Sequence, residues 1–136
     1  MKTFLRIAAV VALLQFTAHT YLLLSYKPKH GLAEDAVVLA MKSARFDFSG
    51  RSHPHSYWDL YIGYGLFAAL NCLIEAVLFW QLAGMGGAKP IVALFILANV
   101  AFAILVWRYF FFLPPMIADL SIAACLGGAL LSRRPR

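Results

Sequence analysis

Apolar residues gather into four long blocks along the chain, and the charged residues gather in the gaps between them. The blocks run over residues 4–26, 57–83, 90–107 and 113–131. Each is close to the roughly 20 apolar residues with which a helix crosses about 30 Å of hydrocarbon. They are too long and too uniformly apolar for the strands of a membrane barrel. The pattern predicts an all-α fold, a four-helix antiparallel transmembrane bundle, with residues 1–136 forming a single four-span domain.

The gap over residues 27–56 is the one long connection, and it has a periodicity of its own. Its apolar positions repeat at helical spacing, at Ala33, Val37, Ala40, Met41 and Ala44. Glu34 and Asp35 open this stretch and Lys42 and Arg45 close it, which is the order of charge that the helix dipole favours. We therefore expect a short amphipathic helix in the first loop, lying on the membrane surface.

Composition strengthens the membrane interpretation. Of the 136 residues 62% are hydrophobic, and the mean hydropathy is +0.77. A soluble domain of this size has no core large enough to hide so much apolar surface, which excludes a soluble catalytic module. The net charge of +6 suits loops near anionic lipid headgroups. Membrane lipids are thus expected partners, whereas nucleic acid is not, because the basic residues are scattered among the spans.

The first block begins like a secretory signal, because Lys2 and Arg6 precede an apolar run. The run continues through 21–24 without a convincing cleavage site, so we expect a signal-anchor helix that is retained.

Orientation is predicted from the basic residues, which are equal in number on the two sides of the membrane. With four spans both termini lie on one side, which carries Lys2, Arg6, Lys89, Arg133, Arg134 and Arg136. The opposite side carries Lys27, Lys29, Lys42, Arg45, Arg51 and Arg108. The basic tail is compact and abuts a span, where positive charge weighs most, so we expect cytoplasmic termini.

Polar side chains within the spans are the candidates for chemistry, because an ionisable group in hydrocarbon costs from about 2.5 to more than 10 kcal/mol. The ionisable ones are His19, Asp59, Glu75 and Asp119, and the neutral ones are Gln15, Asn71 and Asn99. Counted from the side of the long loop at about 1.5 Å per residue, His19 and Asp119 lie at similar depth, about two turns in.

The remaining candidates extend this polar set in both directions. Asp59 lies at the mouth, with Tyr61 and Tyr64 just below it. Asn71 lies near mid-membrane, and Glu75 follows four residues later on the same helix face. If these faces turn inward, the bundle holds a polar column that ends at Glu75.

Two interpretations of these residues stay open. They line a ligand pocket in which His19 and Asp119 exchange protons or hold a polar head, or they form interhelical hydrogen bonds that fix packing. A common cavity would favour the pocket, whereas separate helix contacts would favour packing.

The remaining motifs predict neither a bound cofactor nor a metal site. His53 and His55 are spaced like a ligand pair that Asp47 or His30 could complete, but no recognised ligand spacing accompanies them, and an ordinary loop is favoured. His19 is the only histidine within a predicted span, so one chain offers no bis-histidine haem site.

The two cysteines lie in predicted spans and are not in a Cys-x-x-Cys pair, so we expect them to act as small apolar residues. The Gly63-x-Gly65 pair lacks a phosphate-loop pattern, and we expect it to permit close helix packing.

Four stretches carry a resemblance to a known family. They are AHT at 18–20, AMKSARFDF at 40–48, SYWDLYIGYGL at 56–66 and WRYFF at 107–111. In these stretches the chain resembles an uncharacterised family of small bacterial four-helix integral membrane proteins. The resemblance covers essentially the whole chain. It implies a four-helix fold and a multi-pass place in the bacterial inner membrane, and it implies no activity, substrate or cofactor.

Three classes of function fit these observations. We predict the first, a non-catalytic scaffold or partner subunit that contacts lipid, either as a homo-oligomer or with another membrane protein. The second is a binder or small acid–base enzyme for an apolar, lipid-like ligand, with Asp59 and Tyr61 at the entrance and Glu75 stabilising charge. The third is a small proton-coupled transporter acting as a dimer through Glu75. Small multidrug exporters carry their membrane glutamate in the first helix and have short loops, and this chain departs from both features.

Overall fold

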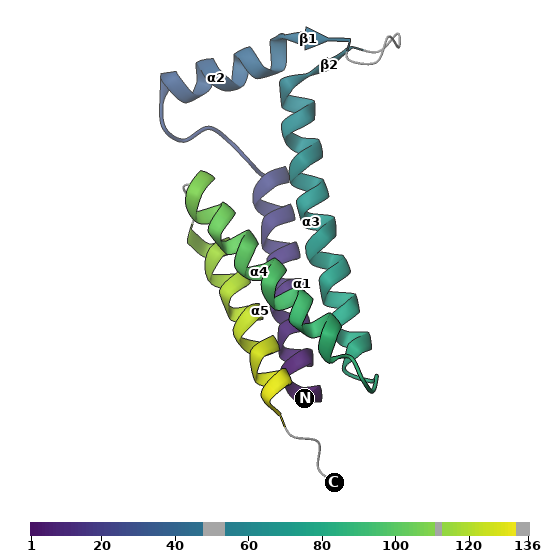
Figure 1. Ribbon diagram of the computed structural model, residues 1–136. Coiled ribbons are helices and arrows are strands. Elements are labelled where there is room, and N and C mark those ends of the chain that lie inside the picture. The colour runs from purple at the N-terminus through teal and green to yellow at the C-terminus, as the bar shows by residue number, and fades with distance from the viewer. Residues whose placement is uncertain (48–53, 111–112, 133–136) are drawn as a thin grey trace. The chain divides into compact units, whose positions relative to one another are not determined.

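The computed structural model describes residues 1–47, 54–110 and 113–132. Within them lie five helices and one pair of short strands, labelled in Figure 1. The chain forms two compact units, each of which is described by itself. Unit 1 comprises Met1–Thr17 and Asn71–Arg136, and unit 2 comprises Ala18–Leu70. The prediction of a single domain over the whole chain stays a prediction.

Four of the helices are long and apolar enough to cross a membrane. They are α1 (Lys2–Leu24), α3 (Tyr57–Leu82), α4 (Lys89–Tyr109) and α5 (Leu113–Leu131). Their ends lie within two residues of the predicted blocks, because the apolar runs end where charged or turn-forming residues begin. The predicted all-α class with four membrane-crossing helices is confirmed, and the chain is a membrane protein by the length and composition of these helices.

Unit 1 is a bundle of four helical segments, in which consecutive helices run in opposite directions and α4 lies beside α5 (Figure 1). It takes residues 2–17 of α1 and 71–82 of α3 together with the whole of α4 and α5. Its core draws on all four segments, from Leu5, Ala8, Ala9, Ala12, Ala76, Phe79, Leu82, Ala83, Ala88, Val92, Ile122, Leu126 and Ala129.

Small residues let the helices of unit 1 approach closely. A Cβ added at Gly128 of α5 would lie 2.9 Å from the ring of Phe4 on α1, so any larger residue would require that ring to move. Phe79 is fully buried and meets Phe95 edge to face at 5.1 Å between ring centroids. In lipid, such van der Waals contact replaces hydrophobic burial as the force that holds helices together.

Unit 2 contains the predicted amphipathic helix, α2 (Leu32–Ser43), which is confirmed. Gly31 precedes it with φ +86°, a conformation that residues with a Cβ rarely adopt. Val38 is buried, whereas Leu32 and Leu39 are exposed and available to a membrane surface.

One part of the expected loop helix is corrected. Arg45 does not close α2, because the helix ends at Ser43 and the backbone is extended at Ala44. Arg45 instead belongs to β1 (Arg45–Phe46), which pairs antiparallel with β2 (His55–Ser56). Strands of two residues are too short to give an alternating pattern, so the sequence offered no signal for this pair.

Candidate functional site

The interior of unit 1 contains a polar link between α1 and α5. Gln15 donates a hydrogen bond from its Nε2 to Oδ1 of Asp119 over 2.9 Å. Asp119 is only 5% exposed, so this amide takes the place of the water that the carboxyl group has lost. The bond ties the first span to the last.

A second polar link joins α3 to α4. Asn99 is fully buried, and its Nδ2 donates to Oε2 of Glu75 over 3.4 Å and to the backbone carbonyl of Phe95 over 3.0 Å. Because the Phe95 carbonyl requires a donor, it fixes which end of the Asn99 amide faces it. The Oδ1 of Asn99 is buried without a hydrogen-bond partner among the described residues.

Four of the polar residues of unit 1 are therefore joined in two interhelical pairs. Each pair connects one carboxyl group to one amide, which is the arrangement by which polar side chains link membrane helices. Asn71 opens the α3 segment of this unit, four residues before Glu75. The pairing with Gln15 and Asn99 was not predicted, although both amides were recognised as polar residues at depth.

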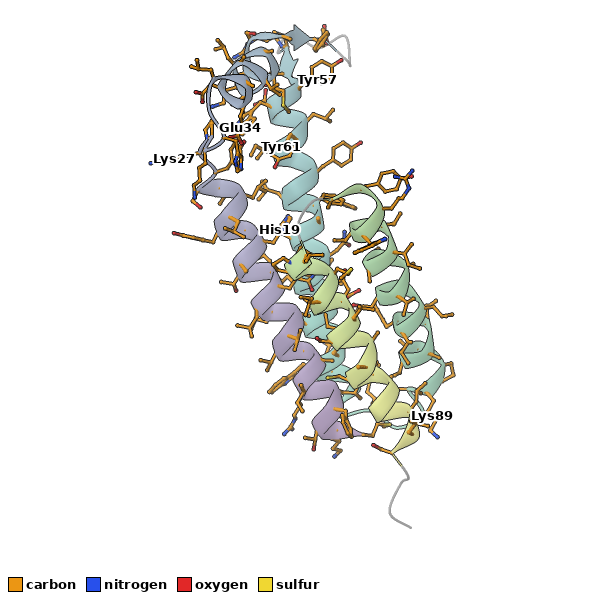
Figure 2. The ribbon with its side chains drawn as sticks, turned by 90° about the vertical axis from the view of Figure 1, so that its left-hand side faces the viewer. His19, Lys27, Glu34, Tyr57, Tyr61 and Lys89 are labelled. Carbon is orange, nitrogen blue, oxygen red and sulfur yellow. The ribbon has the colours of Figure 1, made fainter. Side chains whose placement is uncertain are left out.

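His19 belongs to unit 2, where it meets α3. The Nε2 of His19, a residue labelled in Figure 2, lies 3.0 Å from the carbonyl oxygen of Gly65. Because that oxygen can only accept, this nitrogen carries the proton. Close packing is confirmed at Gly65, because a Cβ there would lie 2.6 Å from Leu23. At Gly63 no atom of the described residues lies within 4 Å of the same position. The predicted pairing of His19 with Asp119 joins residues of different units and stays a prediction, as does the continuous polar column.

Asp59 caps the start of α3. Its Oδ2 accepts hydrogen bonds from the backbone N–H and the hydroxyl group of Ser56, each over 2.8 Å, and its own N–H donates to the Ser56 Oγ over 3.1 Å. This reciprocal arrangement is a capping box. The spacing Ser-x-x-Asp before an apolar run was the available signal, and it gives Asp59 a structural role beside the predicted one at the entrance.

The two tyrosines predicted near the mouth differ in their surroundings. The Tyr61 ring lies 5.4 Å from the Trp58 ring, which in turn lies 5.7 Å from Tyr26. Lys42 of α2 places its Nζ 4.7 Å from the centre of the Trp58 ring. Tyr64 is 68% exposed, so most of its ring is open to the surroundings of unit 2.

Glu34 binds the segment that leads from α1 into α2, a role that was not predicted, because only its favourable place in the helix dipole was recognised. Its carboxylate accepts hydrogen bonds from the Tyr26 hydroxyl and from the backbone N–H groups of Lys29 and His30, the latter two over 2.7 Å each (Figure 2). The bond from Tyr26 and then the two backbone bonds lower the pKa of Glu34 to about 2. The same bond raises the pKa of Tyr26 to about 12.

Metal ligands are not assembled in the part of the chain that the structure describes. No group of three or more His, Cys, Asp or Glu side chains is placed there to hold a metal ion. His53, one member of the histidine pair considered from the sequence, lies outside the described residues. Cys72 and Cys125 are half-buried free thiols.

The chain matches no protein-family model, no curated protein and no solved structure.

Proposed function

We propose that this protein is a non-catalytic integral membrane protein, a scaffold or partner subunit that works in contact with lipid. One observation carries the proposal: four polar side chains inside unit 1 are paired between helices, Gln15 with Asp119 and Asn99 with Glu75. Carboxyl–amide pairs between neighbouring helices are what packing requires, and each of the two carboxyl groups has a hydrogen-bond partner of this kind.

The outer faces of the spans support contact with lipid. On α4 the side chains of Leu94, Leu97 and Ile104 are each more than 60% exposed. Exposing such apolar surfaces to water would cost free energy, whereas contact with hydrocarbon chains would not. Trp107 at the end of the same helix is also exposed, at the level where indole rings favour the membrane interface.

The proposal also covers the membrane in which the protein lies and its orientation there. We assign it to the bacterial inner membrane with cytoplasmic termini and to the uncharacterised four-helix family that its sequence resembles. The basic residues of 133–136, which directly follow the last span, support that orientation. The partner is a second copy or another membrane protein.

The test is native mass spectrometry of the full chain released gently from membranes, compared with the double variant Glu75→Gln/Asp119→Asn. Amides keep much of the hydrogen bonding but remove acid–base chemistry. A scaffold should carry lipid and protein partners only, and the double variant should carry the same ones. A bound molecule of another kind that is lost in the double variant would contradict the proposal.

That contrary result would support a second candidate, a binder or small acid–base enzyme for a lipid-like ligand. The Oδ1 of Asn99, for which the described residues supply no hydrogen-bond donor, favours it, because a buried acceptor beside Glu75 offers a place for a donor group of a ligand. The variant Asn99→Leu separates the two. It should abolish ligand retention if this oxygen holds a ligand, and it should leave lipid retention unchanged in a scaffold.

A further inference from the structure

An apolar groove of about 310 Å³ runs along unit 1 between α1 and α3. Its lining comes from both helices: Ala9, Val10, Leu13, Leu73, Ala76, Val77, Trp80 and Gln81. Val10 and Val77 are each about half exposed, so the groove is open along the outside of the bundle rather than sealed within it. An apolar channel that opens sideways from membrane-crossing helices faces hydrocarbon chains.

The groove has one end near the membrane surface. Trp80 and Gln81 lie at the last turn of α3, and Arg6 lies in the second turn of α1. The Arg6 guanidinium lies 5.3 Å from the centre of the Trp80 ring, so the cation is held beside the groove. Lys2 precedes Arg6 by four residues and therefore shares its helix face.

The groove extends inward from Arg6 over about two thirds of the depth of one lipid leaflet. Leu13 lies seven residues beyond Arg6, about 10 Å along the helix axis. Half of a hydrocarbon layer measures about 15 Å. A chain that entered beside Arg6 would thus lie along most of one leaflet before the groove ends.

The positive charge of Arg6 is not balanced by the acids of its own unit. Unit 1 contains two acidic side chains, Glu75 and Asp119, and their hydrogen bonds go to Asn99 and Gln15. A guanidinium group binds phosphate with two parallel hydrogen bonds, and its long stem lets the charge reach the interface. The site therefore combines an apolar channel with an anion-binding group at its open end.

We propose that the groove between α1 and α3 holds one acyl chain of an anionic phospholipid, whose phosphate is bound by Arg6. The inference rests on the membrane-spanning, lipid-contacting function proposed above and names the class of lipid and its site. Because the Arg6 guanidinium is held beside the groove, its positive charge favours a headgroup with net negative charge over a zwitterionic one.

The experiment uses the full chain in detergent, mixed with equal amounts of phosphatidylglycerol and phosphatidylcholine that have the same acyl chains. Native mass spectrometry then counts the retained lipids. We expect the wild type to retain phosphatidylglycerol over phosphatidylcholine by about fivefold, the effect of one basic residue near a membrane surface. Arg6→Gln should remove the preference and Arg6→Lys should keep most of it.

Matched variants separate this site from general effects. Arg108→Gln removes a cation that also lies over an aromatic ring, that of Tyr109 at 5.4 Å, but outside the groove, and it should keep the preference. Val77→Trp fills the groove from an exposed position and should lower the retention of both lipids severalfold. Val100→Trp, at an exposed position on α4, should not.

Several outcomes would overturn the site. They are equal retention of the two lipids by the wild type, equal losses in Arg6→Gln and Arg108→Gln, or unchanged retention in Val77→Trp. A dimer without lipid that Val77→Trp dissociates would also overturn it, by showing that a second copy covers the groove. Should Arg6→Gln fail to fold, Val77→Trp decides alone. A chain that leaves membranes without detergent would instead overturn the proposed function itself.

Discussion

At the scale of single residues, two glycines on α3 differ in what surrounds them. Gly65 lies against Leu23, whereas an added Cβ at Gly63 would meet open space. A glycine in a helix is less favourable than alanine by up to about 1 kcal/mol, so the removal of glycine helps unless the new methyl group collides with a neighbour.

We therefore expect Gly63→Ala to leave stability unchanged or to raise it by up to about 1 kcal/mol. Gly65→Ala should lower stability, because Leu23 must move from its place between the helices. Unfolding of the purified protein in mixed micelles measures both. If the double variant Gly65→Ala/Leu23→Ala is no more stable than additive single losses predict, the contact with Leu23 is not the cause.

The bond between Gln15 and Asp119 allows a second prediction. We expect a double-mutant cycle of Gln15→Ala, Asp119→Ala and the double variant to give a coupling free energy of about 0.6 kcal/mol. It should be at most about 1.7 kcal/mol, as for other hydrogen bonds between membrane helices. The same micellar unfolding gives the three values. A coupling of zero would mean that the two side chains do not act as a pair.

At the scale of elements, α2 is fixed at its start by Glu34. The pKa of this carboxyl group is lowered from 4.5 to about 2, so its contribution to stability is present above pH 4.5 and is lost as the pH falls toward 2. The pKa of Tyr26 is raised from 10.0 to about 12, so its contribution is present below pH 10 and is lost as the pH rises through 12. Between these limits the link between Tyr26 and Glu34 is intact.

We expect Tyr26→Phe to raise the pKa of Glu34 toward 4.5, because the largest cause of the lowered value is removed. A pH titration of the Glu34 carboxyl carbon by NMR measures the change. Glu34→Gln should also speed hydrogen exchange at the amides of Lys29 and His30, which lose a charged acceptor. Asp35→Asn, one residue further on, should do neither, and equal effects of the two variants would contradict the assignment.

The elements were predictable from the sequence, but most of the polar contacts between them were not. The spans and α2 follow from apolar runs and a helical repeat, which are local properties of the chain. The partners of Asp119 and Glu75 could not be derived, because they depend on the rotation of α1 and α4 about their axes, and these helices are apolar on nearly every side. Asp59 was assigned to an entrance from its depth alone, whereas its spacing to Ser56 already indicated a cap.

At the scale of the whole molecule, four membrane-crossing helices require that consecutive connections lie on opposite sides of the bilayer. Ser25 follows α1 and Met85 follows α3. In a chain whose own cysteines are replaced by alanine, Ser25→Cys and Met85→Cys should therefore react with an impermeant thiol reagent from opposite sides of sealed vesicles. Ser132→Cys, after α5, should react from the same side as Met85→Cys. Labelling of Ser25→Cys and Met85→Cys from one side would contradict four crossings.

The three bonds to Glu34 also limit what α2 can do when the bilayer changes. The segment 25–31 joins the end of α1 to the start of α2, and its backbone is bound at two points to the first turn of the helix that follows. The segment 25–31 therefore cannot extend far unless these hydrogen bonds break. Because this connection cannot lengthen without breaking those bonds, α2 and the end of α1 should move together when the first span changes its tilt in a thicker or thinner bilayer.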